Sequence, residues 1–169
     1  MDPQKVILIS GLESSFKEDA VSATKATGLG QFVAGTFAER IAKSRHPELR
    51  ALRGLSREEL LEKRKDPRIG ALAEHIKDAE DRVKSAFKAN GIRDNVTLAD
   101  IYTVHNIGNP SMAVAARQGK MALAGVSVKA MRNNAQLYEN GINTTAKQYM
   151  ETVDRKFVVI DAKLRNGKK

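Results

Sequence analysis

Signals that begin and end helices recur along almost the whole chain, and they constrain its fold more than any other feature of the sequence. Each start signal pairs a residue that caps helix N-termini with a proline at the first helical position or with a glutamate three residues later. Such pairs occur at Asp2-Pro3, Ser56-Glu59 and Asp66-Pro67. The alternating pattern of a strand does not persist beyond a few residues outside VVI at 158–160. The sequence therefore predicts a mostly α fold.

Apolar residues at helical spacing, bounded by these signals, give the expected helices. Helices are expected from 3 to about 13, from 31 to about 44, over a short stretch from 56, and over 67–90, 97–107, 111–119, 127–138 and 144–157. The polar stretch 14–30, which contains GLG, is expected to be a loop suited to close backbone approach. For 169 residues we expect one compact domain over 1–160, followed by a basic tail over 161–169.

One acid interrupts the apolar face of the first expected helix. Residues spaced i, i+3, i+7 and i+10 point the same way on a helix, and this set comprises Val6, Ile9, Glu13 and Phe16. An ionised carboxylate costs much free energy to desolvate unless a cation pairs with it. A carboxyl group that stays protonated near neutral pH, by contrast, is what a general acid needs. The alternative interpretation is a glutamate at a helix end that reaches solvent or caps a neighbouring turn.

The composition argues against several kinds of site. The chain has no cysteine, which excludes disulfides and thiolate metal ligands. Its histidines, at 46, 75 and 105, lack the spacing of a zinc site, so no metal and no other cofactor is expected. No run of eighteen apolar residues occurs, and the N-terminal segment lacks the cleavage site of a signal peptide. We therefore expect neither a membrane span nor a signal peptide.

The net charge of +9 favours an anionic polymer as partner, such as nucleic acid or cell wall. A solvated basic face that serves only solubility is the other interpretation. Neither a basic motif rich in aromatic residues nor a convincing helix-turn-helix appears in the sequence. Nucleic acid is therefore not expected as the partner.

Four short segments resemble, in order, the lysozyme-like lytic transglycosylase domain of the soluble, goose-lysozyme-related type. They are ESSF at 13–16, AVS at 20–22, GLGQF at 28–32 and IYTVHNIG at 101–108. The family typically shows a Glu-Ser pair, an Ala-Val-Ser stretch, a Gly-Leu-Met-Gln turn and an Ala-Tyr-Asn-Ala-Gly type segment. The resemblance spans residues 3–160 and implies a lysozyme-like helical domain with a catalytic groove. The histidine form of the last segment is similar to versions from bacteriophage and conjugation enzymes.

The resemblance implies a peptidoglycan lytic transglycosylase in which Glu13 is the sole catalytic carboxylate. In this family one acid protonates the glycosidic oxygen between N-acetylmuramic acid (MurNAc) and N-acetylglucosamine (GlcNAc). The same group then deprotonates the C6 hydroxyl of MurNAc, which closes a 1,6-anhydro ring without water. The resemblance also implies substrate-binding roles for Ser22, Gln31, Tyr102, His105 and Asn106.

Structural roles remain open for several of these residues. Ser22 is also interpretable as a plain loop hydroxyl, Tyr102 as a core side chain and Asn106 as a helix C-cap. His105 stands where the wider family often has tyrosine. Gly30 replaces the usual methionine of the turn, which removes an apolar wall from the expected groove.

Two other functions use the same scaffold. A hydrolytic muramidase would share the acid, but goose-type hydrolases add aspartates along the glycine-rich loop, and residues 20–36 contain none. A wall-binding virion component would keep the fold without turnover. We expect a monomer that acts on the glycan strands of peptidoglycan, as a phage virion or lysis protein working in the periplasm or cell wall. Because few residues precede Glu13, we also expect either an excised domain or a small phage enzyme.

Overall fold

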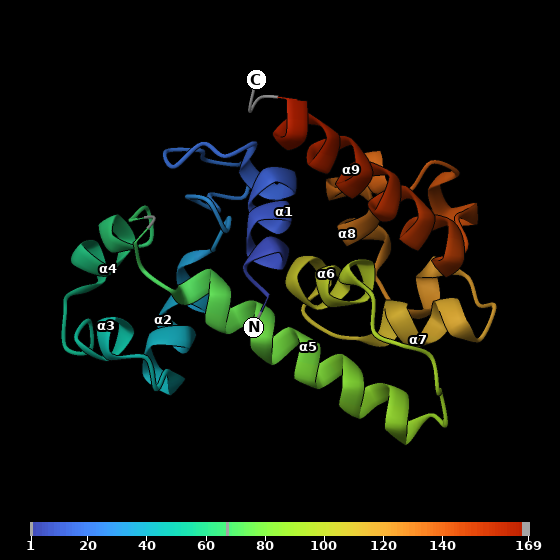
Figure 1. Ribbon diagram of the computed structural model, residues 1–169, viewed down its shortest axis with the longest axis horizontal. Coiled ribbons are helices and arrows are strands. Elements are labelled where there is room, and N and C mark those ends of the chain that lie inside the picture. Colours follow the sequence, from blue (N-terminus) through green and yellow to red (C-terminus); the bar gives the residue numbers. More distant parts are fainter. Residues whose placement is uncertain (1, 67, 167–169) are drawn as a thin grey trace. The chain divides into compact units, whose positions relative to one another are not determined.

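The computed structural model of the chain describes residues 2–66 and 68–166 and is mostly helical (Figure 1). Its α-helices are α1 (Pro3–Ser14), α2 (Ala34–Lys43), α3 (Pro47–Arg50), α4 (Arg57–Lys63), α5 (Ala71–Ala89), α6 (Leu98–Ile107), α7 (Ser111–Arg117), α8 (Val128–Asn133) and α9 (Ala146–Asn166). Three 3-10 helices are η1 (Ala122–Ala124), η2 (Ala135–Leu137) and η3 (Gly141–Asn143). Within the described residues, β-structure is limited to isolated bridges. The predicted mostly α fold class is therefore confirmed.

The chain divides into two compact units, Met1–His75 and Ile76–Lys169, which we call the N-terminal unit and the C-terminal unit. The division falls inside α5. The sequence analysis expected a single domain and a basic tail over 161–169. Residues 161–166 of that tail continue α9, and 167–169 lie outside the described residues.

Helix α1 begins as its sequence predicts. Asp2 caps it by accepting a hydrogen bond from the backbone N–H of Gln4 at 2.9 Å, and Ile9 is fully buried in the core. The helix ends at Ser14, and the residues after it turn away from the helical path. Phe16 therefore lies beyond the helix and is 43% exposed. The prediction that Phe16 continues the apolar face was wrong, because the helix stops before it.

Helix α2 starts three residues later than predicted, because the preceding segment is used in a tight loop. Thr27 and Phe32 exchange two backbone hydrogen bonds, of 3.1 and 3.2 Å, which closes residues 27–32 into a turn. At the other end of α2, Arg53 donates to three backbone carbonyls, those of Ile41, Ala42 and Ser44. These bonds satisfy carbonyl groups that a helix end leaves without intrahelical partners.

The predicted start of α5 at residue 67 was wrong by about one turn, since the helix begins at Ala71. The side chain of Asp66 instead accepts hydrogen bonds from the backbone N–H of Arg68 at 3.0 Å and from its guanidinium group at 3.0 and 3.1 Å. These bonds lower the pKa of Asp66 to about 2. The Asp-Pro signal therefore marks a turn before the helix.

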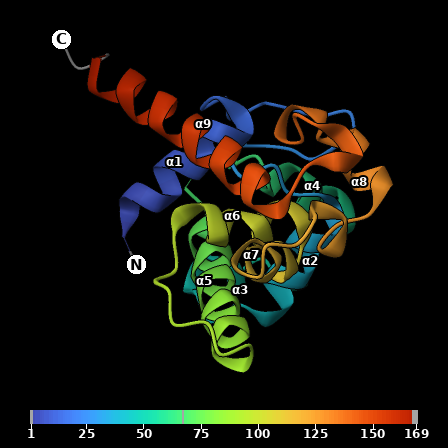
Figure 2. The ribbon, with the colours of Figure 1, turned by 90° about the vertical axis from the view of Figure 1, so that its right-hand side faces the viewer.

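In the C-terminal unit α6, α7 and α9 pack on one another (Figure 2). Thr97 and Asp100 form a reciprocal capping box at the start of α6, and Gly108 ends it with φ 89°. The predicted helix 127–138 is split into α8 and η2. The run VVI at 158–160 lies inside α9, so its β-branched residues are helical in this context.

Candidate functional site

The proposed catalytic acid, Glu13, lies in the last turn of α1 in the N-terminal unit. Glu13 is half-buried, and its Oε1 atom is shielded from solvent. The next side chain, Ser14, is buried and donates from its hydroxyl to the carbonyl of Ser10 at 2.9 Å. This bond helps to hold the last turn of α1 in place.

The backbone reverses direction immediately after the acid. Ser15 and Phe16 both adopt left-handed conformations, with φ of 52° and 64°. Residues that carry a Cβ atom seldom occupy this region, and two in succession are uncommon. Strained backbone of this kind persists where the surrounding structure fixes it, and such positions concentrate at functional sites.

The glycine-rich loop of the N-terminal unit is held together by two of the proposed substrate-binding residues. The amide nitrogen of Gln31 donates to the carbonyls of Ala20 at 3.1 Å and Gly28 at 2.9 Å. The hydroxyl of Ser22 accepts from the backbone N–H of Ala26 at 3.0 Å and lies 2.9 Å from the hydroxyl of Thr24. Both residues thus have a demonstrable structural role. Among the described residues no hydrogen bond uses Oε1 of Gln31, which leaves that atom as an acceptor for a ligand.

Two glycines in this loop are required by close packing. A Cβ atom on Gly28 would lie 2.7 Å from the carbonyl oxygen of Arg64, and the guanidinium of Arg64 donates to the carbonyl of Phe32 at 2.9 Å. A Cβ atom on Gly30 would lie 2.8 Å from the ring of Phe32 and 3.2 Å from Leu72. The Phe32 ring therefore occupies the space in which the family's methionine was expected, and it supplies an apolar surface there.

A cavity of about 170 Å³ lies beside the loop within the N-terminal unit. Its walls include Val6 and Ser10 of α1, Leu29 and Gly30 of the loop, and Phe37 and Leu72. Glu13 is not among the residues that line this cavity. The cavity therefore lies beside the glycine-rich loop and is not lined by the proposed acid.

The remaining proposed residues, Tyr102, His105 and Asn106, share one side of α6 in the C-terminal unit. The rings of Tyr102 and His105 have centroids 6.1 Å apart. Tyr102 is buried, whereas His105 and Asn106 are half-buried. The structure thus brings these three side chains together, as their i, i+3 and i+4 spacing on a helix requires.

Asn106 is the centre of a polar cluster inside the C-terminal unit. Its Nδ2 atom donates to Oδ1 of Asn134 at 3.3 Å and to the hydroxyl of Tyr102 at 3.5 Å. The hydroxyl of Tyr149 donates to Oδ1 of Asn106 at 3.5 Å. These bonds are longer than the usual 2.9 Å or so, so each of them is weak.

Two members of this cluster, Tyr149 and Asn134, were missed by the sequence analysis, as was Tyr138 beside them. Tyr149 is fully buried, and its ring lies 5.1 Å from that of Tyr138. Within the described residues the hydroxyl of Tyr138 has no hydrogen-bond partner, and burial raises its pKa to about 12. The signal in the sequence was weak, because a single tyrosine on a predicted helix is usually an ordinary core residue.

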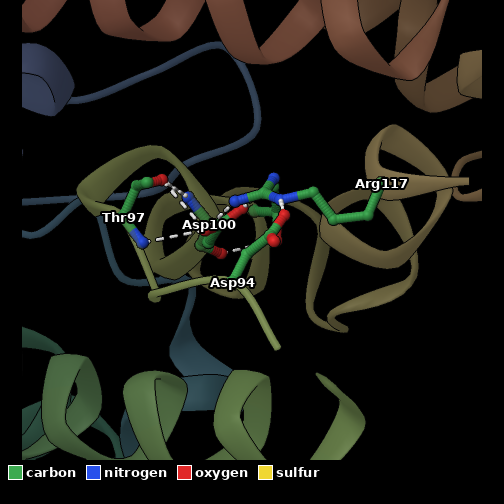
Figure 3. A network of polar contacts seen from close by, with 5 residues as sticks. Asp94, Thr97, Asp100 and Arg117 are labelled. Carbon is green, nitrogen blue, oxygen red and sulfur yellow. Dashed lines mark hydrogen bonds and ion pairs between the residues drawn. The ribbon is translucent and has the colours of Figure 1, made fainter. Parts of the chain in front are cut away.

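An ion pair anchors the start of α6, which carries three of the proposed residues (Figure 3). Both carboxylate oxygens of the fully buried Asp100 accept hydrogen bonds from Arg117, at 2.9 and 2.7 Å. Thr97 donates to Oδ2 of Asp100 from its backbone and its hydroxyl, at 2.8 and 2.9 Å. Arg117 also contacts Asp94 at 3.2 Å and covers the ring of Phe87. The bidentate geometry fixes the position of α6 relative to α7.

A comparison with protein families finds a similarity in the N-terminal part of the chain. The family model of the transglycosylase SLT domain matches residues 1–65. The matched segment covers less than half of the chain. No curated protein matches the chain.

The segment that matches the family model contains Glu13, Ser22 and Gln31, whereas Tyr102, His105 and Asn106 lie beyond it. The description of the matching family model names a transglycosylase. None of the helices in the described residues is long and apolar enough to cross a membrane. In the same residues, histidine and acidic side chains form no group of three or more that could hold a metal ion.

Replacing Gln31 by alanine is expected to loosen the glycine-rich loop. The variant loses two hydrogen bonds to backbone carbonyls, which is expected to cost about 1–2 kcal/mol of stability. If Oε1 of Gln31 binds glycan, kcat/KM is expected to fall as well. Melting temperature and turnover on purified cell wall, measured together, separate the two effects. Val21→Ala, which shortens an exposed side chain of the same loop, is the matched control and is expected to behave like the parent. An unchanged melting temperature for Gln31→Ala would contradict the structural role.

Proposed function

We propose that this chain is a lytic transglycosylase that cleaves the β-1,4 bond between MurNAc and GlcNAc and leaves a 1,6-anhydroMurNAc end. The observation that carries the proposal is a single half-buried carboxylate, Glu13, at the end of α1 within the segment that matches the SLT family. The nearest acids along the chain, Glu18 and Asp19, are exposed. Most glycosidases need two carboxyl groups that flank the bond, whereas an intramolecular reaction needs one.

Glu13 is assigned both proton transfers. As the acid it gives its proton to O4 of GlcNAc, while the bond from C1 of MurNAc to that oxygen breaks. As the base the resulting carboxylate takes the proton from O6 of MurNAc, and O6 then bonds to C1. The acid is regenerated and no water is consumed. Shielding of Oε1 supports this role, because a proton transfer group works best in a site from which water is largely excluded.

The other residues are assigned to positioning and binding. Gln31 is proposed to present Oε1 to the glycan from a loop that its own amide nitrogen stabilises, and Ser22 to support that loop. For Tyr102, His105 and Asn106 we retain substrate binding as the proposed role, supported by the polar cluster around Asn106. We further propose a phage-encoded enzyme of the cell wall, on the resemblance of IYTVHNIG at 101–108 alone.

Digestion of purified peptidoglycan in heavy-oxygen water tests the reaction class. We expect 1,6-anhydroMurNAc ends without the label, because the attacking oxygen is the sugar's own O6. A hydrolytic muramidase would instead place the label in a new reducing end. Labelled reducing MurNAc as the main primary product would overturn the proposal in favour of the hydrolase. If the protein is folded and sediments with cell wall but forms neither product, a binding component would be favoured.

A further inference from the structure

Four large apolar side chains are exposed in one segment of the C-terminal unit, residues 119–147. They are Met121 at 41%, Leu123 at 42%, Val128 at 38% and Ile142 at 57% exposure. Exposed apolar residues that occur singly are normal, but a group of them marks an interaction surface. The question is whether these four residues form such a group.

The short elements that carry these residues contact one another. Both η1 and α8 pack against η3. The backbone N–H of Ala122 donates to the carbonyl of Thr144 at 2.9 Å, and Met121 forms a β-bridge with Thr145. Leu123 lies in η1, Val128 is the first residue of α8 and Ile142 lies in η3. The four exposed side chains are therefore carried by neighbouring elements, and we call them together the apolar patch.

Exposure of the apolar patch is not the result of loose packing. The same segment buries Ala122, Met131 and Leu137 almost completely. Gly125 lies so close to the start of α7 that a Cβ atom there would be 2.7 Å from the backbone nitrogen of Met112. The segment thus has its own core and a rigid attachment to α7, and the patch residues lie outside that core.

Exposed cations lie next to the residues of the apolar patch along the chain. Lys120, Lys129, Arg132 and Lys147 are exposed, and the only acid between residues 119 and 147 is Glu139. Glu139 is itself paired with Arg155 at 2.6 Å. In the part of the chain that the structure describes, Lys120, Lys129 and Arg132 form no ion pair. The surface therefore combines apolar side chains with basic groups that lack intramolecular counterions.

We propose that the apolar patch docks the protein on the surface of a bilayer that contains anionic lipid. Such a surface offers phosphate groups to the lysines and, just below them, an acyl region for the Met, Leu, Val and Ile side chains. A second copy of this chain fits less well, because its cations would repel those of the first. An anionic glycan or nucleic acid would leave the apolar side chains in water. The docking is peripheral and reversible, and it does not depend on the catalytic assignment of Glu13.

Sedimentation with vesicles tests this inference on the full chain. We expect binding to vesicles of phosphatidylglycerol and phosphatidylcholine, much weaker binding to phosphatidylcholine alone, and a loss of binding as salt rises. The double variant Leu123→Ser/Ile142→Ser is expected to bind at least tenfold more weakly. Lys120→Gln/Lys129→Gln is expected to weaken binding and to flatten its dependence on salt.

Val158→Ser is the matched control for the apolar change. Val158 is 69% exposed and lies on α9, about 20 Å along the helix from Thr145. This variant is expected to bind like the parent, and all variants to melt like the parent, because the altered side chains are exposed. Failure of the parent to bind anionic vesicles, or equal binding by Leu123→Ser/Ile142→Ser, would overturn the proposal. A dimer in solution that the same double variant dissociates would also overturn it, in favour of a second copy.

Discussion

Glu13→Gln is expected to lower the rate of cell-wall cleavage by at least about a thousandfold. The amide is nearly isosteric with the acid but neither gives up a proton nor accepts one in the second step, so the variant loses acid and base together. A thousandfold corresponds to about 4 kcal/mol of transition-state stabilisation. Release of anhydro-ended fragments from purified peptidoglycan, measured under single-turnover conditions, gives the rate directly.

The matched control for this change is Glu18→Gln, which removes an exposed carboxylate five residues further along the chain. It is expected to act at the rate of the parent. The melting temperature of Glu13→Gln should stay close to that of the parent, since the glutamine keeps the shape of the half-buried side chain. A Glu13→Gln variant that clears cell wall at the parent rate would show that another group is the acid.

Arg117→Met is expected to destabilise the protein by about 3–5 kcal/mol. The change leaves the fully buried carboxylate of Asp100 without its bidentate partner, and an uncompensated charge in that position is costly. For a chain of this size the loss corresponds to a fall in melting temperature of about 6–20 °C. Thermal or chemical unfolding, followed by circular dichroism, measures it.

A double-mutant cycle separates the ion pair from simple loss of packing around Arg117. Adding Asp100→Asn to Arg117→Met removes the isolated charge, so we expect the double variant to recover part of the lost stability. Arg155→Met is the control, because it breaks an exposed pair with Glu139 and should cost less than about 1 kcal/mol. If Arg117→Met and Arg155→Met have equal effects, the network around Asp100 does not anchor α6.

The position of a candidate site residue on its helix could be predicted when residues near it in the sequence fix where that helix begins. Glu13 was placed near the end of α1 because the Asp2-Pro3 signal and the apolar spacing fix where that helix begins. Tyr102, His105 and Asn106 were placed on one helix for the same reason. What the sequence did not reveal is that Gln31 and Ser22 use their side chains to hold the loop, since their partners depend on how the loop closes.

The sequence by itself determined the mostly α fold and most helix starts, as at Ser56 and Thr97, because a cap bonds to the backbone two or three residues away and needs no distant partner. Tertiary structure decided which local preference prevailed where helix and strand signals compete. It made 158–160 helical within α9 and brought Tyr149 and Arg117 to residues far away in the sequence. Contacts of this kind form only when helices pack, and no pattern among neighbouring residues in the sequence predicts them. They can also override the local preference of a segment for helix or strand.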